Sequence, residues 1–209
     1  MGKTFIADHA LISHKIAVLR DERTGTRDFR LIAGEIAMLL AYEVFREMPT
    51  VSVKIKTPVA ETEERVLSGR KPVIVPILRA GLGMMNGVLE IIPSAKVGHI
   101  GLKRDEVTHE PCEYYCNLPE HMDERVAVIT DPMLATGGSA VQAVDLLKNL
   151  GCRDIRFMCI IAAPEGLEKL RNAHPDIDIY IGSLDKRLNE DAYIVPGLGD
   201  AGDRIFGTK

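Results

Sequence analysis

Five short apolar segments, separated by stretches of helical periodicity, constrain the fold more than any other feature of this sequence. They are rich in β-branched residues without regular polar alternation, the pattern of strands buried on both faces. They cover residues 73–78, 97–102, 125–130, 155–162 and 177–182, with helical stretches at 81–92, 138–150 and 164–173. The alternation predicts an α/β fold whose parallel sheet is joined by right-handed helical crossovers. Ligands of such sheets bind beyond the carboxyl ends of the strands, so we search for a site there.

The N-terminal third of the chain has a different pattern. Residues 28–47 predict one long amphipathic helix, because their apolar residues recur with a period near 3.6 until Pro49. Val51, Val53 and Ile55 then alternate with polar residues, which predicts a strand with one buried face. We expect the stretch 51–59 to project from the body and to contact a partner subunit.

Composition and charge exclude several classes of protein. The chain has 209 residues, of which 26 are basic and 30 acidic, so its net charge of -4 would repel a nucleic acid. Apolar runs such as 36–42 are far shorter than the roughly 18 to 20 residues of a membrane helix, and the first ten residues lack a signal-peptide pattern. We therefore expect a single cytoplasmic domain over 1–209 with no nucleic-acid or membrane partner. The spacing of the four cysteines favours free thiols over a zinc site or disulfides.

The strongest motif covers residues 126–140, where a buried strand leads through Asp131 and a loop of small residues into a helix. Free N–H groups at the helix start, close approach at Gly137 and Gly138, and the hydroxyls of Thr136 and Ser139 all suit a phosphate. Asp131 would repel that phosphate, so we interpret it as an acceptor for sugar hydroxyls or a metal-bound water. No lysine follows the two glycines, which excludes a Walker loop and favours a sugar monophosphate.

Two further segments end in glycine-rich loops. In 73–83 a buried strand is followed by Arg79, Ala80 and Gly81, an arrangement in which the guanidinium can fork onto a pyrophosphate. Residues 197–202 spell G-x-G-x-x-G, but only seven residues follow them. That is too few for the helix and strand of a dinucleotide-binding unit, so we reject a Rossmann interpretation.

The loop after Asp131 resembles the 5-phosphoribosyl-1-pyrophosphate (PRPP) loop of the type I phosphoribosyltransferases. Pro132 stands where that loop usually has a second acid, a form that resembles the uracil phosphoribosyltransferases, and the likeness extends along essentially the whole chain. It implies a C-terminal base-binding hood over about 183–209 together with N-terminal residues, and a flexible hairpin loop over 105–115. The implied reaction transfers the phosphoribosyl group of PRPP to uracil, giving UMP and pyrophosphate.

The resemblance also assigns residues. It implies catalytic roles for Arg79, Arg104, Asp131 and Asp200. It implies uracil contacts at Ile194, Gly199, Asp200 and Ala201. The edge of uracil presents an acceptor, a donor and an acceptor, which main-chain N–H, C=O and N–H groups can match. Mg²⁺ would be held mainly by PRPP, with no protein side chain assigned to it. The implied PRPP contacts are Arg79, Arg104, Asp131, Pro132, Met133, Leu134, Ala135, Thr136, Gly137, Gly138, Ser139 and Asp200.

Partners and alternatives follow from the same comparison. The resemblance implies a homo-oligomer, a dimer or tetramer, and in several family members the region of 8–27 forms subunit contacts or an effector site, which makes GTP a candidate effector. One alternative is another nucleobase phosphoribosyltransferase, against which the Pro132 form of the loop argues. The other is a phosphoribosyltransferase-like regulator that binds nucleic acid, against which the acidic charge argues.

Overall fold

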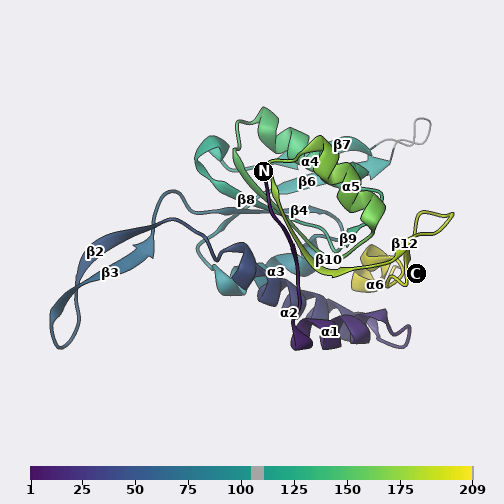
Figure 1. Cartoon of the computed structure of the whole chain (residues 1–209), viewed down its shortest axis with the longest axis horizontal. Coiled ribbons are helices and arrows are strands. Elements are labelled where there is room, and N and C mark those ends of the chain that lie inside the picture. The colour runs from purple at the N-terminus through teal and green to yellow at the C-terminus, as the bar shows by residue number, and fades with distance from the viewer. Residues whose placement is uncertain (105–110, 209) are drawn as a thin grey trace.

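A twisted sheet forms the centre of the computed structural model, which describes residues 1–104 and 111–208 (Figure 1). The strand order is β1-β11-β10-β8-β4-β6-β7, with β5 beside β4 and β9 beside β10. These pairings are parallel except for the antiparallel pair β6–β7. The strands are β1 (Thr4–Ile6), β4 (Val73–Leu78), β5 (Lys96–Val97), β6 (His99–Arg104), β7 (Pro111–Asn117), β8 (Val126–Thr130), β9 (Met133–Leu134), β10 (Asp154–Ala162) and β11 (Asp178–Leu184).

Helices cover both faces of the sheet, as the sequence predicted for a parallel α/β fold (Figure 1). One face carries α1 (Ala10–Arg20), α2 (Thr26–Val44), α3 (Leu82–Ile91) and the short α6 (Ala201–Phe206). The other face carries α4 (Gly138–Asn149) and α5 (Pro164–Ala173). Within the described part of the chain, no helix combines the length and the apolar character that crossing a bilayer requires.

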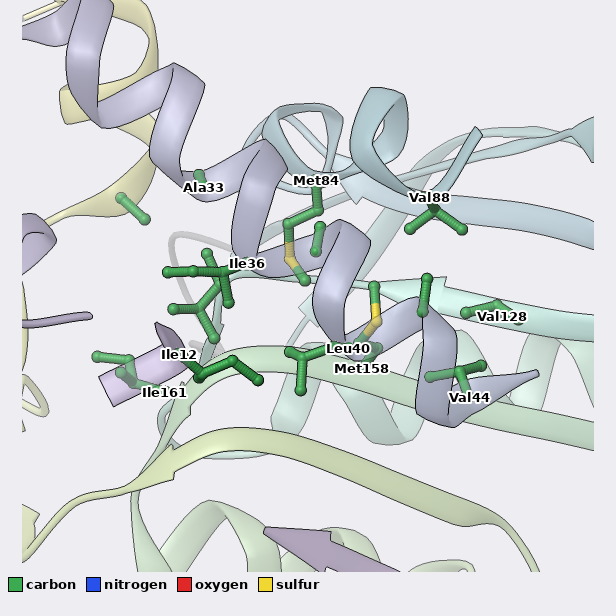
Figure 2. Packing of buried hydrophobic residues seen from close by; sticks show 14 of the residues in the cluster. Ile12, Ala33, Ile36, Leu40, Val44, Met84, Val88, Val128, Met158 and Ile161 are labelled. Carbon is green, nitrogen blue, oxygen red and sulfur yellow. The ribbon is translucent and has the colours of Figure 1, made fainter. Parts of the chain in front are cut away.

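Helix α2 is the main support of the first face (Figure 2). Ile36, Leu40 and Val44 are fully buried, and their spacing of four residues places them on one side of the helix. They pack in one cluster with residues of α1, α3 and the sheet, among them Met84 and Met158. The helix ends at Val44, earlier than predicted, and residues 45–47 continue as a turn.

The predicted strands and crossover helices are confirmed, with small differences at their ends. Helix α5 has the predicted bounds and β4 coincides with 73–78. The predicted strand 97–102 is divided, because β5 ends at Val97 and β6 begins at His99. Helices α1 and α6 and the edge strand β1 were not predicted from the sequence.

The predicted strand at 51–56 and its projection from the body are confirmed, but the single chain buries neither face of the strand. β2 (Thr50–Lys56) and β3 (Glu61–Leu67) form a hairpin that projects from the body, and almost every residue of it is exposed (Figure 1). Val51 and Ile55 are 48% and 41% exposed. The alternation correctly indicated a strand with an apolar face, but periodicity cannot tell whether the same chain covers that face.

Two short strands, β12 (Arg187–Leu188) and β13 (Ile194–Val195), pair antiparallel in the C-terminal segment. This segment follows the carboxyl end of β11 and leads into α6. It therefore lies at the edge of the sheet where ligands of parallel α/β folds bind.

Candidate active site

A small cavity of about 90 Å³ lies at the carboxyl end of β8. It is far smaller than a typical pocket for a drug-sized molecule, roughly 300 to 1,000 Å³, and suits one small anion. The first main-chain bond of α4 is donated by Val141 N–H to Gly137 C=O at 3.0 Å, so the N–H groups just before it are available to a ligand. The cavity is lined by Asp131, Met133, Leu134, Ala135, Thr136, Gly137, Gly138, Ser139 and Ala140.

Gly137 shapes this cavity. It precedes α4 with φ +79°, in the left-handed region. A Cβ there would also lie 2.8 Å from the carbonyl oxygen of Gly166 in α5. Only glycine fits both the conformation and the close packing, so the loop can turn tightly over the start of α4.

Asp131 lies between the cavity and the C-terminal segment. Its Oδ1 accepts a hydrogen bond from Met133 N–H at 3.3 Å. The pKa of the Asp131 carboxyl is raised to about 7, mainly by burial and to a smaller extent by the Asp200 carboxylate, while the hydrogen bond from Met133 N–H acts in the opposite direction. The two acids therefore share one electrostatic environment, although 69 residues of sequence separate them.

Pro132, expected as a PRPP contact, is not among the residues that line the cavity. It is buried, and its carbonyl oxygen accepts the N–H groups of Ile160 and Ile161, both at 3.1 Å. The structure therefore places it in the packing between the loop and β10. There it holds the loop in register with the sheet.

Arg79 follows β4, the strand next to β8. Its side chain is 57% exposed and lies 3.6 Å from the Asp203 carboxylate. Its guanidinium also lies over the Phe206 ring, 5.8 Å from the centroid. Arg79 thus approaches α6 and brings a positive charge to the same sheet edge as Asp131.

The turn after Arg79 is tied to the turn after β8. Thr130 Oγ1 donates to the carbonyl oxygen of Gly81 at 3.2 Å. A Cβ on Gly81 would lie 2.3 Å from the Thr130 carbonyl oxygen. Gly81 is thus required for close packing against the end of β8.

Arg104 is the last residue of β6, which pairs with β4. The flexible loop predicted at 105–115 falls partly outside the described residues, since 105–110 are not described. Its remaining part, 111–115, belongs to β7, which pairs antiparallel with β6. This pairing gives the stretch the hairpin form that was predicted, and its mobility stays a prediction.

The four residues expected to contact uracil are close in the C-terminal segment but differ in exposure. Ile194 and Ala201 are buried in the core that α2 supports, whereas Gly199 and Asp200 are exposed. Asp200 Oδ1 accepts Asp203 N–H at 2.9 Å and so caps α6. Only backbone groups of the two buried residues can be offered to a ligand.

Two charged residues that hold this segment in place were not predicted from the sequence. Asp185 directly follows β11 and forms a salt bridge with Arg20 at the end of α1. The available signal was the one that identified Asp131, an acid directly after the carboxyl end of a buried strand. Arg204 in α6 was likewise missed, because no sequence pattern shows which main-chain groups an arginine meets.

A larger cavity of about 1,040 Å³ lies between α2, α3 and α6. Of the described residues, those that line it include none of the predicted site residues. Size alone would favour this cavity. The position of Asp131 and Arg79 at adjoining strand ends favours the smaller one.

A small cavity lined by an acid, with an arginine after the neighbouring strand, on a parallel sheet covered by helices on both faces, defines a class: the fold is that of the type I phosphoribosyltransferases. The solved structure of APRTase from Giardia lamblia is 13% identical with a TM-score of 0.50, covers 75% of this chain and 81% of its own, and shares the fold. Within this class, the model of the family "Uracil phosphoribosyltransferase" matches residues 6–208. The chain belongs to that family.

Individual relatives agree over the whole length. Proteins named uracil phosphoribosyltransferase from Clostridium beijerinckii and Streptococcus thermophilus are 58% and 60% identical over 209 residues, with all of both chains covered. A solved structure of a protein from Aquifex aeolicus is 36% identical, with a TM-score of 0.93 and 99% of each chain covered. The expected recognition and fold class are confirmed.

Proposed function

We propose that this protein transfers the 5-phosphoribosyl group of PRPP to uracil, giving UMP and pyrophosphate. The observation that carries the proposal is the sheet edge itself, where the anion cavity, Asp131 and Arg79 lie together in a chain that matches the family over 6–208. A nucleobase phosphoribosyltransferase needs a 5′-phosphate site, a pyrophosphate site and a base site around one ribose. The loop at 131–139, Arg79 and the C-terminal segment supply the three.

The residues act mainly by position and charge. As the bond from the ribose C1 to pyrophosphate breaks, the ribose gains oxocarbenium character and the leaving group gains negative charge. Arg79 and Arg104 hold the departing pyrophosphate, and Asp131 with Asp200 binds ribose hydroxyls and favours the cationic ribose. The loop at 135–139 holds the 5′-phosphate at the start of α4.

The base is recognised by main chain. Uracil presents an acceptor, a donor and an acceptor along one edge, and the segment from Ile194 to Ala201 offers N–H and C=O groups to it. Ile194 and Ala201 are buried, so their side chains fix the backbone and do not reach the base. A main-chain site of this kind discriminates by the orientation of peptide groups.

Mg²⁺ accompanies PRPP in the proposed reaction. Asp131 and Asp200 provide carboxylate oxygens, which Mg²⁺ prefers as ligands. Among the described residues, neither acid belongs to a cluster of three possible metal ligands. Such a donor set fits a cation that takes most of its ligands from substrate and water. The described residues do contain one cluster of three possible metal ligands, His121, Asp123 and Glu124, but it lies outside the site. Bound with PRPP, Mg²⁺ would neutralise charge on the pyrophosphate.

We also propose a homo-oligomer. An isolated two-stranded hairpin is only marginally stable in water. The hairpin of β2 and β3 exposes Val51, Ile55 and Val66, and α2 exposes Leu31 and Tyr42. A second copy of the chain would cover such apolar surface. Regulation by GTP stays a prediction of the family resemblance.

The test is formation of UMP from radiolabelled uracil and PRPP, with and without Mg²⁺, followed by separation of the products. We expect UMP and pyrophosphate in equal amounts, only when Mg²⁺ is present. Incorporation of hypoxanthine or adenine in place of uracil would show that the substrate is wrong while the reaction class holds. No transfer to any base would overturn the proposal.

A further inference from the structure

The salt bridge between Arg20 and Asp185 forms hydrogen bonds with both main-chain groups of Gly197. Asp185, whose side chain is 2% exposed, accepts Gly197 N–H on Oδ2 at 2.9 Å. Arg20 pairs with both oxygens of Asp185 and also donates from Nη1 to Gly197 C=O at 2.7 Å. The N–H and the C=O of a single residue are thus fixed by opposite members of one ion pair.

No other residue type fits at position 197. Its φ is +66°, and a Cβ would lie 2.1 Å from the Ile194 carbonyl oxygen. The chain therefore folds back tightly between Ile194 and Gly199, the stretch expected to face uracil. The direction of the following peptide groups depends on how Gly197 is held.

A second arginine fixes the next residue from the same side. Arg204 Nη1 donates to Leu198 C=O at 2.9 Å, and its Nη2 donates to Asp21 C=O at 2.7 Å. Its guanidinium stacks over the Phe29 ring at 4.4 Å from the centroid. Arg204 thereby connects the loop to the turn between α1 and α2, just as Arg20 connects it to the end of α1.

We propose that Arg20, Asp185 and Arg204 are positioning residues that set the affinity and selectivity for the base, by fixing the main chain at 197–199. This inference rests on the proposed function, since it concerns how the same site recognises uracil. A site built from side chains can adjust by rotamer changes, whereas a main-chain site can only move its peptide groups. Displacement of such groups by about 1 Å can cost roughly 100-fold in rate, so the groups that hold them control recognition.

A purely structural role for these residues makes a different prediction. Loss of stability reduces the fraction of active molecules and hence the maximal rate, but it leaves KM unchanged. Loosening of the base loop raises KM for uracil more than KM for PRPP, because the phosphate cavity and Arg79 belong to other elements and only Asp200 of the implied PRPP contacts lies in the loop. The split between the two KM values therefore separates the two roles.

The variants are Arg20→Lys, Asp185→Asn and Arg204→Lys. Lysine keeps the charge but cannot span the separate partners that each guanidinium holds, and asparagine keeps an oxygen acceptor but loses the ion pair. The matched control is Arg156→Lys. Arg156 is also buried and pairs with Asp154, but it lies near the amino end of β10, away from the carboxyl edge.

We expect each loop variant to raise KM for uracil by about tenfold, the lower value for one lost charge-assisted hydrogen bond, with KM for PRPP changed by less than about twofold. The ratio of kcat/KM for uracil over cytosine should fall, and Arg20→Ala should exceed Arg20→Lys in effect. Arg156→Lys should lower the melting temperature without moving either KM. Both KM values can be measured on whatever fraction folds.

An unchanged KM for uracil in all three variants would overturn the inference and leave a structural role. An equal rise in both KM values would overturn it too, since the effect would not be confined to the base. Failure of the proposed function is recognised separately, because the wild-type protein would then form no UMP from uracil at all.

Discussion

Replacing Asp131 by asparagine should weaken the activity and strengthen the fold, and the gain in stability should depend on pH. Burial raises the pKa of this carboxyl from 3.8 to about 7 in the folded protein. Between those values the folded protein binds a proton that the unfolded chain has released. The stability of the wild type therefore falls as pH rises through this window, and asparagine removes the cause.

The magnitude follows from the shift. One pKa unit corresponds to about 1.4 kcal/mol, so the penalty relieved by Asp131→Asn would be at most about 1.7 kcal/mol at pH 5 and about 4 kcal/mol at pH 8. The side chain keeps some contact with solvent, which lowers both figures. We expect the advantage of the variant in free energy of unfolding to grow by roughly 1 to 2 kcal/mol between pH 5 and pH 8.

The assay is urea unfolding of both proteins at pH 5 and pH 8, without ligands. Asp176→Asn serves as a control of opposite sign, because Lys148 lies 2.7 Å from Asp176 and lowers the pKa of its carboxyl. That variant should be slightly less stable than the wild type by the same amount at both pH values, and equal to it only in strong acid. The activity of Asp131→Asn should fall by roughly 10- to 150-fold in kcat/KM, the cost of a charge-assisted hydrogen bond.

Two results would refute the reasoning. A stability difference for Asp131→Asn that is the same at pH 5 and pH 8 would show that the carboxyl is not held protonated by its surroundings. Kinetics close to wild type in the folded variant would show that the carboxylate does not bind ribose or favour its positive charge.

The remaining predictions concern the other parts of the site and the surface. Gly137→Ala should raise KM for PRPP at least tenfold, because a Cβ would strain the loop and press on Gly166. Initial rates measured over a range of PRPP concentrations check this, and an unchanged KM would count against a phosphate site there. Cytosine should react at least about 10⁴-fold more slowly than uracil, since its edge reverses two of three hydrogen-bonding groups, while 5-fluorouracil should react; competition assays decide this, and comparable use of cytosine would exclude main-chain recognition. Sedimentation at micromolar concentration should show a dimer or larger species. The double variant Val51→Lys, Ile55→Lys should shift the sedimenting mass toward the 23 kDa of one chain. A wild type that sediments at 23 kDa would contradict the role of the hairpin.

The elements that could be predicted from the sequence are those whose burial produces a recognisable local pattern of apolar residues. β4, β8 and β10 are buried along almost their whole length, so their composition alone indicated strands covered on both faces. Helix α5 begins with Pro164 at its first position, which gave a clear boundary. By contrast, α6 has six residues, too few for a periodic pattern, and its position depends on Asp200 and Arg204.

The sequence by itself determined the parallel α/β fold, the anion loop after β8 and the presence of Asp131 and Arg79 at strand ends, because each depends on residues that are neighbours in the chain. Only the tertiary structure decided that Pro132 packs against β10, that the hairpin of β2 and β3 leaves both faces exposed, and that Asp131 and Asp200 share one field. It alone also joined Arg20 to Gly197, 177 residues away. Such contacts arise when separate segments meet in the packed fold, and the local pattern of either segment carries no record of the other.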